Sequence, residues 1–440
     1  MKKKQFITAV ALICFLLGTS FGVAAVAAGK GGNPFNKIWQ ALTIHEERLT
    51  ALEEQIGLSG EITIGSLLPL TGDLATFGEN SRATIDFAAE KVNAFLEETG
   101  ANWILKIVHE DSETNPVVAL ERTESLFARG IQFMIGPQTS DCVASIKDYC
   151  DSNEILVVSQ SSTRPGLNNP DDFLFRFCPT DLVQGLAIAR LIVDDEVTKI
   201  ISVYRNDAWG KGLHDATKDR FEQPDLGGEF VESIAYDPDA PDFDTIAATL
   251  DAIVTDAKNT YGANKVGVLY IAFEEVVQFF TECSEYSSDG WGVKWYGSDG
   301  TAINPDMVTD QTTAAFSYET EFINPMFSPP QSDRWQKVHD YVIAELGRSP
   351  DSYAYVAYDI VWAIAYSLMI VGKYDTSVVR DVLPDVTASL FGASGWIALN
   401  ADGDRAASDY DLWIIDLIDT TFEWKCAGRY MQATDSTIRE

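Results

Sequence analysis

Three short loops carry the side chains best suited to binding a small charged molecule. Two are rich in hydroxyl groups and the third is acidic: Gly136-Pro137-Gln138-Thr139-Ser140, Ser159-Gln160-Ser161-Ser162-Thr163 and Gly297-Ser298-Asp299-Gly300. Hydroxyl groups at the start of a helix, together with its free backbone N–H groups, favour an anion such as a carboxylate. The aspartate of the third loop favours a cation such as an ammonium group. The combination is what binding an α-amino acid requires.

The same residues do not favour catalysis. The run Ser161-Ser162-Thr163 has no histidine or lysine close by in the sequence, and no GxSxG nucleophile motif occurs. The four histidines are scattered and no CxxC pair exists, which counts against a zinc site. The acidic run at residues 237–242 lacks the glycine and terminal glutamate of a calcium loop. We therefore expect a protein that is not an enzyme and that holds no metal and no cofactor.

The three loops follow strands in a chain that alternates strand and helix signals from Glu61 onwards. Strands are predicted near 62–68, 104–108, 133–135 and 155–158, and a second series lies near 200–204, 230–235 and 266–271. Amphipathic helices between them predict an α/β fold of two doubly wound lobes, each a parallel sheet with helices on both faces. Ligands of such sheets bind at the carboxyl ends of the strands, where the loops lie.

The N-terminus has the pattern of an export segment. Met1 to Lys4 is basic, residues 6–28 carry no charge, and Ala25-Val26-Ala27 matches a small-x-small cleavage site. A stretch of this length is compatible both with a cleaved signal peptide and with a retained membrane anchor. Either alternative places the folded part outside the cytoplasm, secreted, periplasmic or on the cell surface.

A linker and a heptad-like repeat follow. Leu42, Leu49 and Ile56 are spaced by seven residues, which predicts either a short coiled-coil stalk that self-associates through residues 38–56 or an amphipathic helix packed on the domain. We divide the chain into a signal or anchor (1–28), a linker and stalk (29–60), a first lobe (61–180 plus 326–392) and a second lobe (181–325 plus 393–440).

The charge of the chain limits its partners. It has 66 aspartates and glutamates against 32 lysines and arginines, a formal net charge of −34. This excludes a nucleic-acid partner, because the phosphates would be repelled. The sequence leaves open how the cysteines that follow the N-terminal segment pair, namely Cys142, Cys150, Cys178, Cys283 and Cys426.

Five segments in order resemble the type I periplasmic binding proteins of ABC importers, specifically the leucine/isoleucine/valine-binding family. The resemblance runs from about Glu61 to Ile415 and is carried by Gly65 to Gly72 with Phe77-Gly78, Ile135-Gly136-Pro137, Ser159 to Thr163, Asp207 to Gly212 and Tyr296 to Gly300. It implies a clamshell that closes on a zwitterionic amino acid and delivers it to an ABC permease in the membrane. Two alternatives remain open, a ligand-sensing receptor ectodomain and a binding protein for an amide or urea-like solute.

The resemblance also implies roles for individual residues. The ligand carboxylate falls to Ser140, the backbone of Ser161 and Thr163, and the ammonium group falls to Asp299. The implied aromatic walls are Phe77, Trp209 and Phe273, with Tyr353 or Tyr355 as a further contributor. The chain departs from the family at Gln138, where an apolar residue is common, and at Glu274, near a position that is often aromatic. Both departures count against a purely aliphatic ligand.

Overall fold

The structure is a computed structural model that describes Thr43 and residues 57–286 and 290–439. The predicted signal or anchor (1–28) and the predicted linker and stalk, including the segment 38–56, lie outside the described residues apart from Thr43 and residues 57–60. Gly57–Glu440 form one compact unit.

The first lobe is built on a six-stranded parallel sheet with the order β13-β5-β4-β3-β1-β2. Its strands are β1 (Gly60–Leu68), β2 (Trp103–Asp111), β3 (Phe133–Ile135), β4 (Leu156–Ser159), β5 (Leu174–Pro179) and β13 (Asp404–Arg405). The helices are α3 (Ala75–Thr99), α4 (Pro116–Ala128), α5 (Ser140–Ser152), α12 (Asp333–Leu346), α13 (Ser352–Val371) and α14 (Thr376–Ala388). The hairpin strands β11 (Phe391–Gly392) and β12 (Gly395–Trp396) pair beside them.

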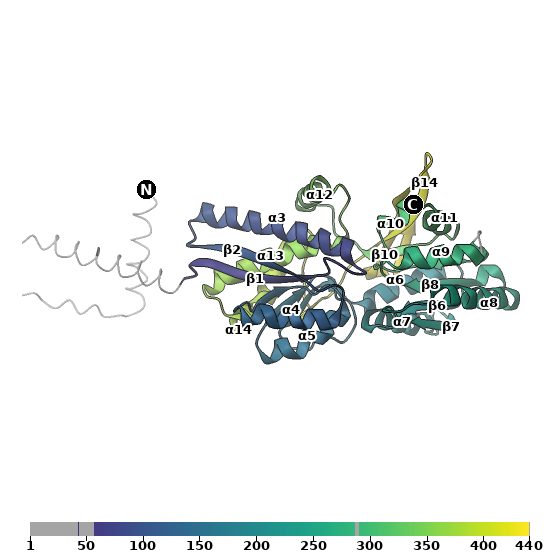
Figure 1. Ribbon diagram of the computed structural model, residues 1–440, viewed down its shortest axis with the longest axis horizontal. Coiled ribbons are helices and arrows are strands. Elements are labelled where there is room, and N and C mark those ends of the chain that lie inside the picture. Colours follow the sequence, from purple (N-terminus) through teal and green to yellow (C-terminus); the bar gives the residue numbers. More distant parts are fainter. Residues whose placement is uncertain (1–42, 44–56, 287–289, 440) are drawn as a thin grey trace, which may run out of the picture. The chain divides into compact units, whose positions relative to one another are not determined.

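Alternating side chains of this sheet enter two different cores. On β3, Phe133 and Ile135 pack into the cluster shared with α3, α13 and α14, whereas Met134 packs into the cluster shared with α4 and α5. This alternation follows from the two-residue period of a strand. Helices therefore cover both faces of the sheet, as Figure 1 shows.

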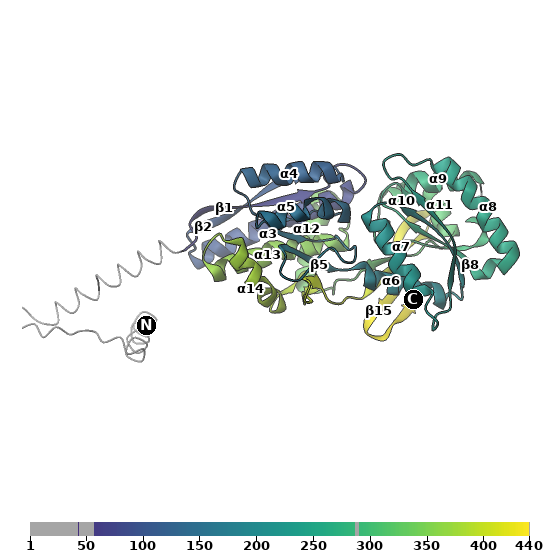
Figure 2. The same cartoon turned by 90° about the horizontal axis from the view of Figure 1, so that it is seen from below.

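The second lobe combines a parallel and an antiparallel sheet. The parallel sheet has the order β7-β6-β8-β9, with β6 (Lys199–Arg205), β7 (Glu229–Tyr236), β8 (Val266–Ile271) and β9 (Lys294–Tyr296). The antiparallel sheet has the order β10-β14-β15-β16, with β10 (Asn324–Phe327), β14 (Tyr410–Ile418), β15 (Thr421–Met431) and β16 (Ser436–Arg439). A bridge between Tyr296 and Ile323 links the two. The C-terminal strands of this sheet, β14 to β16, are yellow in Figure 2.

Helices also cover the second lobe. They are α6 (Asp181–Asp194), α7 (Ala208–Phe221), α8 (Phe243–Tyr261), α9 (Val276–Tyr286), α10 (Asp306–Thr309) and α11 (Gln311–Glu319), with short 3-10 turns η1 (Ala263–Lys265), η2 (Gly290–Gly292) and η3 (Gln432–Thr434). Residues of α6 and α7 pack in one cluster, and those of α8 and α9 pack in another against the same strands. The α/β prediction with two doubly wound parallel sheets is confirmed, and the C-terminal antiparallel sheet is an addition to it.

The predicted lobe boundary at residue 393 is wrong. Strand β13 pairs with β5 in the first lobe, and Asp359 of α13 accepts hydrogen bonds from the backbone of Ala393 and Ser394 at 2.6 and 2.8 Å. Residues 393–405 therefore belong to the first lobe, and the chain crosses to the second only before β14. A strand of two residues has no sequence pattern of its own, so periodicity could not reveal it.

Helix α13 is long and apolar enough to cross a membrane by length and composition. In the structure most of its residues are buried, and it packs against α3 and α14 as a core helix. The five cysteines that the structure describes are free thiols, and four of them are buried.

Candidate ligand-binding site

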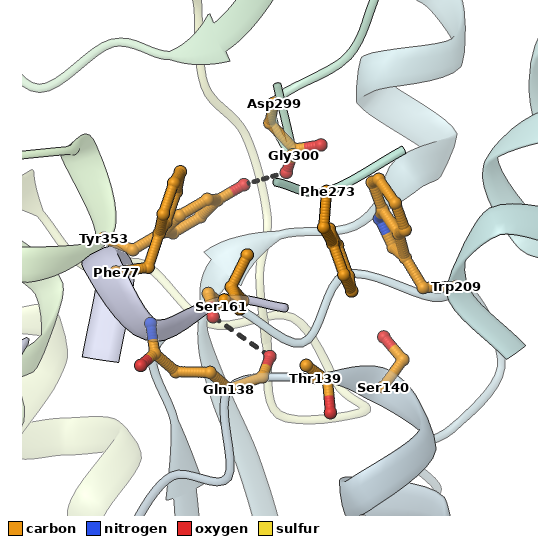
Figure 3. Close-up of a pocket in the computed structure, with 11 residues that line it drawn as sticks. Phe77, Gln138, Thr139, Ser140, Ser161, Trp209, Phe273, Asp299, Gly300 and Tyr353 are labelled. Carbon is orange, nitrogen blue, oxygen red and sulfur yellow. Dashed lines mark hydrogen bonds between the residues drawn. The ribbon is translucent and has the colours of Figure 1, made fainter. Parts of the chain in front are cut away.

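A pocket lies between the two lobes, where the carboxyl ends of both parallel sheets meet (Figure 3). The space between its lining atoms, open solvent included, is about 320 Å³. The first lobe contributes Leu74, Phe77, Gln138, Thr139, Ser140, Ser161 and Tyr353, and the second contributes Trp209, Phe273, Asp299 and Gly300. The structure thus brings together every residue proposed from the sequence except Thr163, Glu274 and Tyr355, the alternative to Tyr353, and it adds Leu74, Thr139 and Gly300.

Hydroxyl groups at the start of α5 line one side of the pocket. Thr139 caps this helix, its side chain accepting from the backbone N–H of Cys142. The Ser140 hydroxyl accepts hydrogen bonds from Ser162 Oγ and Arg164 N, both at 3.2 Å. Its own hydrogen is left to donate to a pocket ligand. Donors at a helix start suit an anion, since the helix dipole places partial positive charge there.

Arg176, which does not line the pocket, holds the hydroxyl-rich loop of Ser159 to Thr163 in place. Its fully buried guanidinium binds the Asp404 carboxylate through two hydrogen bonds of 2.7 and 2.8 Å. The remaining nitrogen, Nη1, donates to the carbonyl oxygens of Ser162 and Arg164 at 3.0 and 2.6 Å. The planar guanidinium therefore ties β5, β13 and the loop together in one geometry. Sequence analysis missed this residue because its partner lies 228 positions away.

Buried carboxyl groups lie on the opposite side of the pocket. Asp299 follows β9, and its Oδ2 accepts a hydrogen bond of 2.5 Å from the Tyr353 hydroxyl of the first lobe. Gln184 joins it to a second carboxylate, accepting from Asp299 N at 3.0 Å and donating to Asp181 Oδ1 at 3.3 Å. Burial raises the pKa of Asp181 well above its ordinary value, and the charge of Asp299 raises it further. Burial also raises the pKa of Asp299.

Thr163 belongs to this acidic side and does not line the pocket. It is fully buried, and its carbonyl oxygen accepts a hydrogen bond from Asp181 N at 2.8 Å. Asp181 was missed in the sequence, although its position at the start of α6, directly after a strand, was a usable signal.

Aromatic rings form the wall on the second lobe. The rings of Trp209 and Phe273 stack at 4.4 Å between centroids, and the Arg205 guanidinium lies 4.1 Å from the Phe273 ring centre on top of them. Gly300 lies against this stack, where a Cβ atom would come within 2.4 Å of the Ala272 carbonyl oxygen and 2.6 Å of Trp209. Any larger residue at position 300 would displace the wall.

Two carboxylates connect the lobes reciprocally beside the pocket. Asp141 of the first lobe accepts from the backbone N–H of Ala208 at the start of α7, at 2.9 Å. Glu274 of the second lobe accepts from the backbone N–H of Thr76 at the start of α3, at 3.0 Å. Glu274 therefore caps a helix of the facing lobe. Each contact places negative charge at the positive end of a helix dipole.

Buried acids make the stability of the chain depend on pH. Burial raises the pKa of Asp351, the cap of α13, to about 6. Between the ordinary value near 4 and this value the folded chain holds the proton and the unfolded chain releases it, so stability falls as pH rises. We expect the ligand-free chain to be about 1–2 kcal/mol more stable at pH 5.0 than at pH 7.5 from this group alone.

Differential scanning calorimetry at the two pH values measures this effect. In Asp351→Asn, which keeps a capping side chain, the gain on acidification should shrink by that amount. Asp181 and Asp299 act in the same direction, whereas burial lowers the pKa of His214 and His339, which act in the opposite one. An equal response of variant and wild type would contradict the assignment to Asp351.

Comparison with known proteins shows which family the chain belongs to. The family model described as "Receptor family ligand binding region" matches residues 80–417. The protein MJ1266 of Methanocaldococcus jannaschii is 32% identical over 85% of this chain and 90% of its own length. Leu/Ile/Val-binding protein homolog 3 of Brucella melitensis is 29% identical over 43% of this chain and 51% of its own length.

Solved structures show the same fold at low identity. The branched-chain amino acid transporter substrate-binding protein LivJ of Streptococcus pneumoniae, in complex with isoleucine, has a TM-score of 0.68 and 19% identity, covering 86% of this chain and all of its own. An ABC-transporter solute-binding protein of Rhodopseudomonas palustris BisB5, in complex with 3,4-dihydroxybenzoic acid, has a TM-score of 0.66 and 14% identity, covering 86% of this chain and 97% of its own. The chain therefore belongs to the receptor ligand-binding-region family and is a type I periplasmic binding protein of the branched-chain amino-acid-binding family.

Proposed function

We propose that this chain is the extracytoplasmic solute-binding protein of an ABC importer and that it binds an amino acid between its lobes. The observation that carries the proposal is the opposition of two kinds of group across one pocket. Ser140 and the start of α5 lie on the first lobe, and the Asp299 carboxylate lies on the second. A zwitterion would place its carboxylate against the former and its ammonium group against the latter.

The charge balance of the pocket supports an ammonium group. None of the lining residues is a lysine or arginine, so no protein cation of the lining neutralises Asp299. The charge of Asp299 also raises the pKa of the second carboxyl group, Asp181. A bound cation would relieve this repulsion, because an opposite charge favours the ionised form of a carboxylate.

Contacts between the lobes would couple ligand binding to closure of the lobes. Asp299 of the second lobe bonds Tyr353 of the first, and the reciprocal caps at Ala208 and Thr76 lie beside them. A ligand held by both lobes would favour the form in which these contacts exist, as in other hinged clamshells. A membrane permease would then recognise the closed form. Residues 1–28 would export or anchor the chain, and residues 38–56 would serve as the self-association segment.

Thermal-shift and calorimetric titration of the full-length chain tests the proposal. We expect at least one L-α-amino acid to raise the melting temperature by a few degrees, because ligand that binds only the folded state stabilises it by mass action. The matching α-keto acid and amine, each of which keeps only one charged group, should bind far more weakly.

Two other outcomes would replace the proposal. Binding of benzoate-type acids with no amino acid bound would assign the pocket to aromatic acids, which lack an ammonium group. Turnover of any bound compound would make the chain an enzyme, whereas the Brucella melitensis relative and the Streptococcus pneumoniae neighbour are binding proteins by name.

A further inference from the structure

Gln138 holds a buried amide at the wall of the pocket. It follows β3, is 1% exposed and lines the pocket. Figure 3 shows its side chain extending toward Phe77 and Tyr353, away from Trp209. Within residues 57–286 and 290–439, neither its amide nitrogen nor its amide oxygen makes a hydrogen bond.

Further unpaired polar atoms occur on neighbouring elements. Gln160 directly follows β4, the strand that pairs with β3, and its fully buried amide also makes no hydrogen bond to the described part of the chain. On α3, one turn beyond Phe77, the Asn80 Oδ1 and Ser81 Oγ atoms are buried and likewise unpaired among the described residues. Asn80 is fixed there by its amide nitrogen, which donates to Asp351 at 2.9 Å.

Buried amides without partners are rare in folded proteins, since each forfeits its hydrogen bonds to water. The carboxylate side of the pocket has its own donors in Ser140 and α5, and the ammonium side has Asp299. The unpaired amide of Gln138, a residue of the pocket lining, lies below Phe77 in the view of Figure 3, on the side away from Trp209. It offers both a donor and an acceptor, and it carries no charge.

We propose that Gln138 binds the ligand's side chain and that this side chain is neutral and hydrogen-bonding, of the carboxamide or hydroxyl class. The proposal rests on the proposed function, because it takes the other two ligand groups as the carboxylate and the ammonium. An aliphatic side chain would leave the Gln138 amide buried and unpaired. A charged side chain would meet no opposite charge at Gln138 itself.

Isosteric amino acids provide a sharp test. L-asparagine and L-leucine differ by exchange of an amide oxygen and nitrogen for two methyl groups, and L-threonine and L-valine differ by one hydroxyl. We expect the polar member of at least one pair to bind the full-length chain about 10-fold more tightly or better, because the aliphatic member strands a buried polar group. Isothermal titration calorimetry measures both members under the same conditions.

The variant Gln138→Met should reduce or reverse this preference. Gln132→Met is the matched control, because Gln132 immediately precedes the same strand, lies outside the pocket lining and bonds the Asn153 carbonyl. It should keep the wild-type ratio. The ratio is taken within each protein, so a partly misfolded variant cannot imitate the effect.

Each other outcome overturns a different statement. Equal or tighter binding of leucine and valine by wild type would overturn the side-chain assignment and leave amino-acid binding intact. An unchanged ratio in Gln138→Met would remove Gln138 from the specificity site. Failure of every α-amino acid to bind would overturn the proposed function together with this inference.

Discussion

Replacing Asp299 by asparagine is expected to weaken amino-acid binding by about 30-fold or more while leaving the fold intact. Truncating one partner of a buried charge pair generally costs about 2–5 kcal/mol, because the other charge stays buried and unpaired. Asparagine retains an oxygen that can accept from Tyr353. It also removes a carboxylate that burial and the neighbouring Asp181 make unfavourable, so the ligand-free variant should melt no lower than wild type.

Calorimetric titration and thermal melting of the same sample separate the two effects. Asp219→Asn is the matched control, since Asp219 is exposed on α7 and lies outside the pocket lining. Amino-acid affinity in Asp299→Asn equal to that of wild type would show that the ammonium group is bound elsewhere. An aromatic acid that binds the variant better than wild type would point to a ligand without an ammonium group.

Replacing Arg176 by methionine should have the largest effect on stability. Removal of one partner of a buried ion pair typically destabilises a protein by about 3–5 kcal/mol. Here it would leave the Asp404 carboxylate without its guanidinium, together with the carbonyl oxygens of Ser162 and Arg164. The hydroxyl loop would lose its support as well, so ligand affinity should fall in variant molecules that remain folded.

Urea unfolding of the ligand-free chain measures this loss. The double variant Arg176→Met with Asp404→Asn should recover part of it, because the uncompensated charge is then gone. Arg129→Met, which breaks a half-exposed pair with Glu110, is the control and should unfold at nearly the wild-type urea concentration. A loss no larger in Arg176→Met than in the control would contradict the supporting role of Arg176.

Local patterns predicted the parallel sheets and most of the pocket. Periodicity places strands and helices, and the loops after β3, β4 and β9 are short, so Gln138, Ser140, Ser161 and Asp299 could lie only at the carboxyl ends of strands. The aromatic residues Trp209 and Phe273 follow from the same rule, because they come directly after β6 and β8.

Contacts between distant segments could not be predicted from the sequence. Glu274 was assigned to the pocket, yet its carboxylate caps α3, 198 residues away. Thr163 was assigned to the ligand, yet it lies against Asp181. Both outcomes depend on how two lobes face each other, and neither periodicity nor spacing encodes that relation. The same holds for β13, whose pairing with β5 brings Arg176 and Asp404 together.

Under the proposed function, the carboxylates of Asp141 and Glu274 contribute to the balance between an open and a closed form of the chain. Water can replace each of these hydrogen bonds when the lobes part, and each, because it is made to a carboxylate, contributes about 1.5–3 kcal/mol net. Together with the bond between Tyr353 and Asp299, these contacts favour the closed form, and about 5.5 kcal/mol of extra ligand affinity for that form would move a population from 1:99 to 99:1. Under the proposed function, a ligand of ordinary affinity would suffice to close the chain, and its release to the permease would let the lobes separate again.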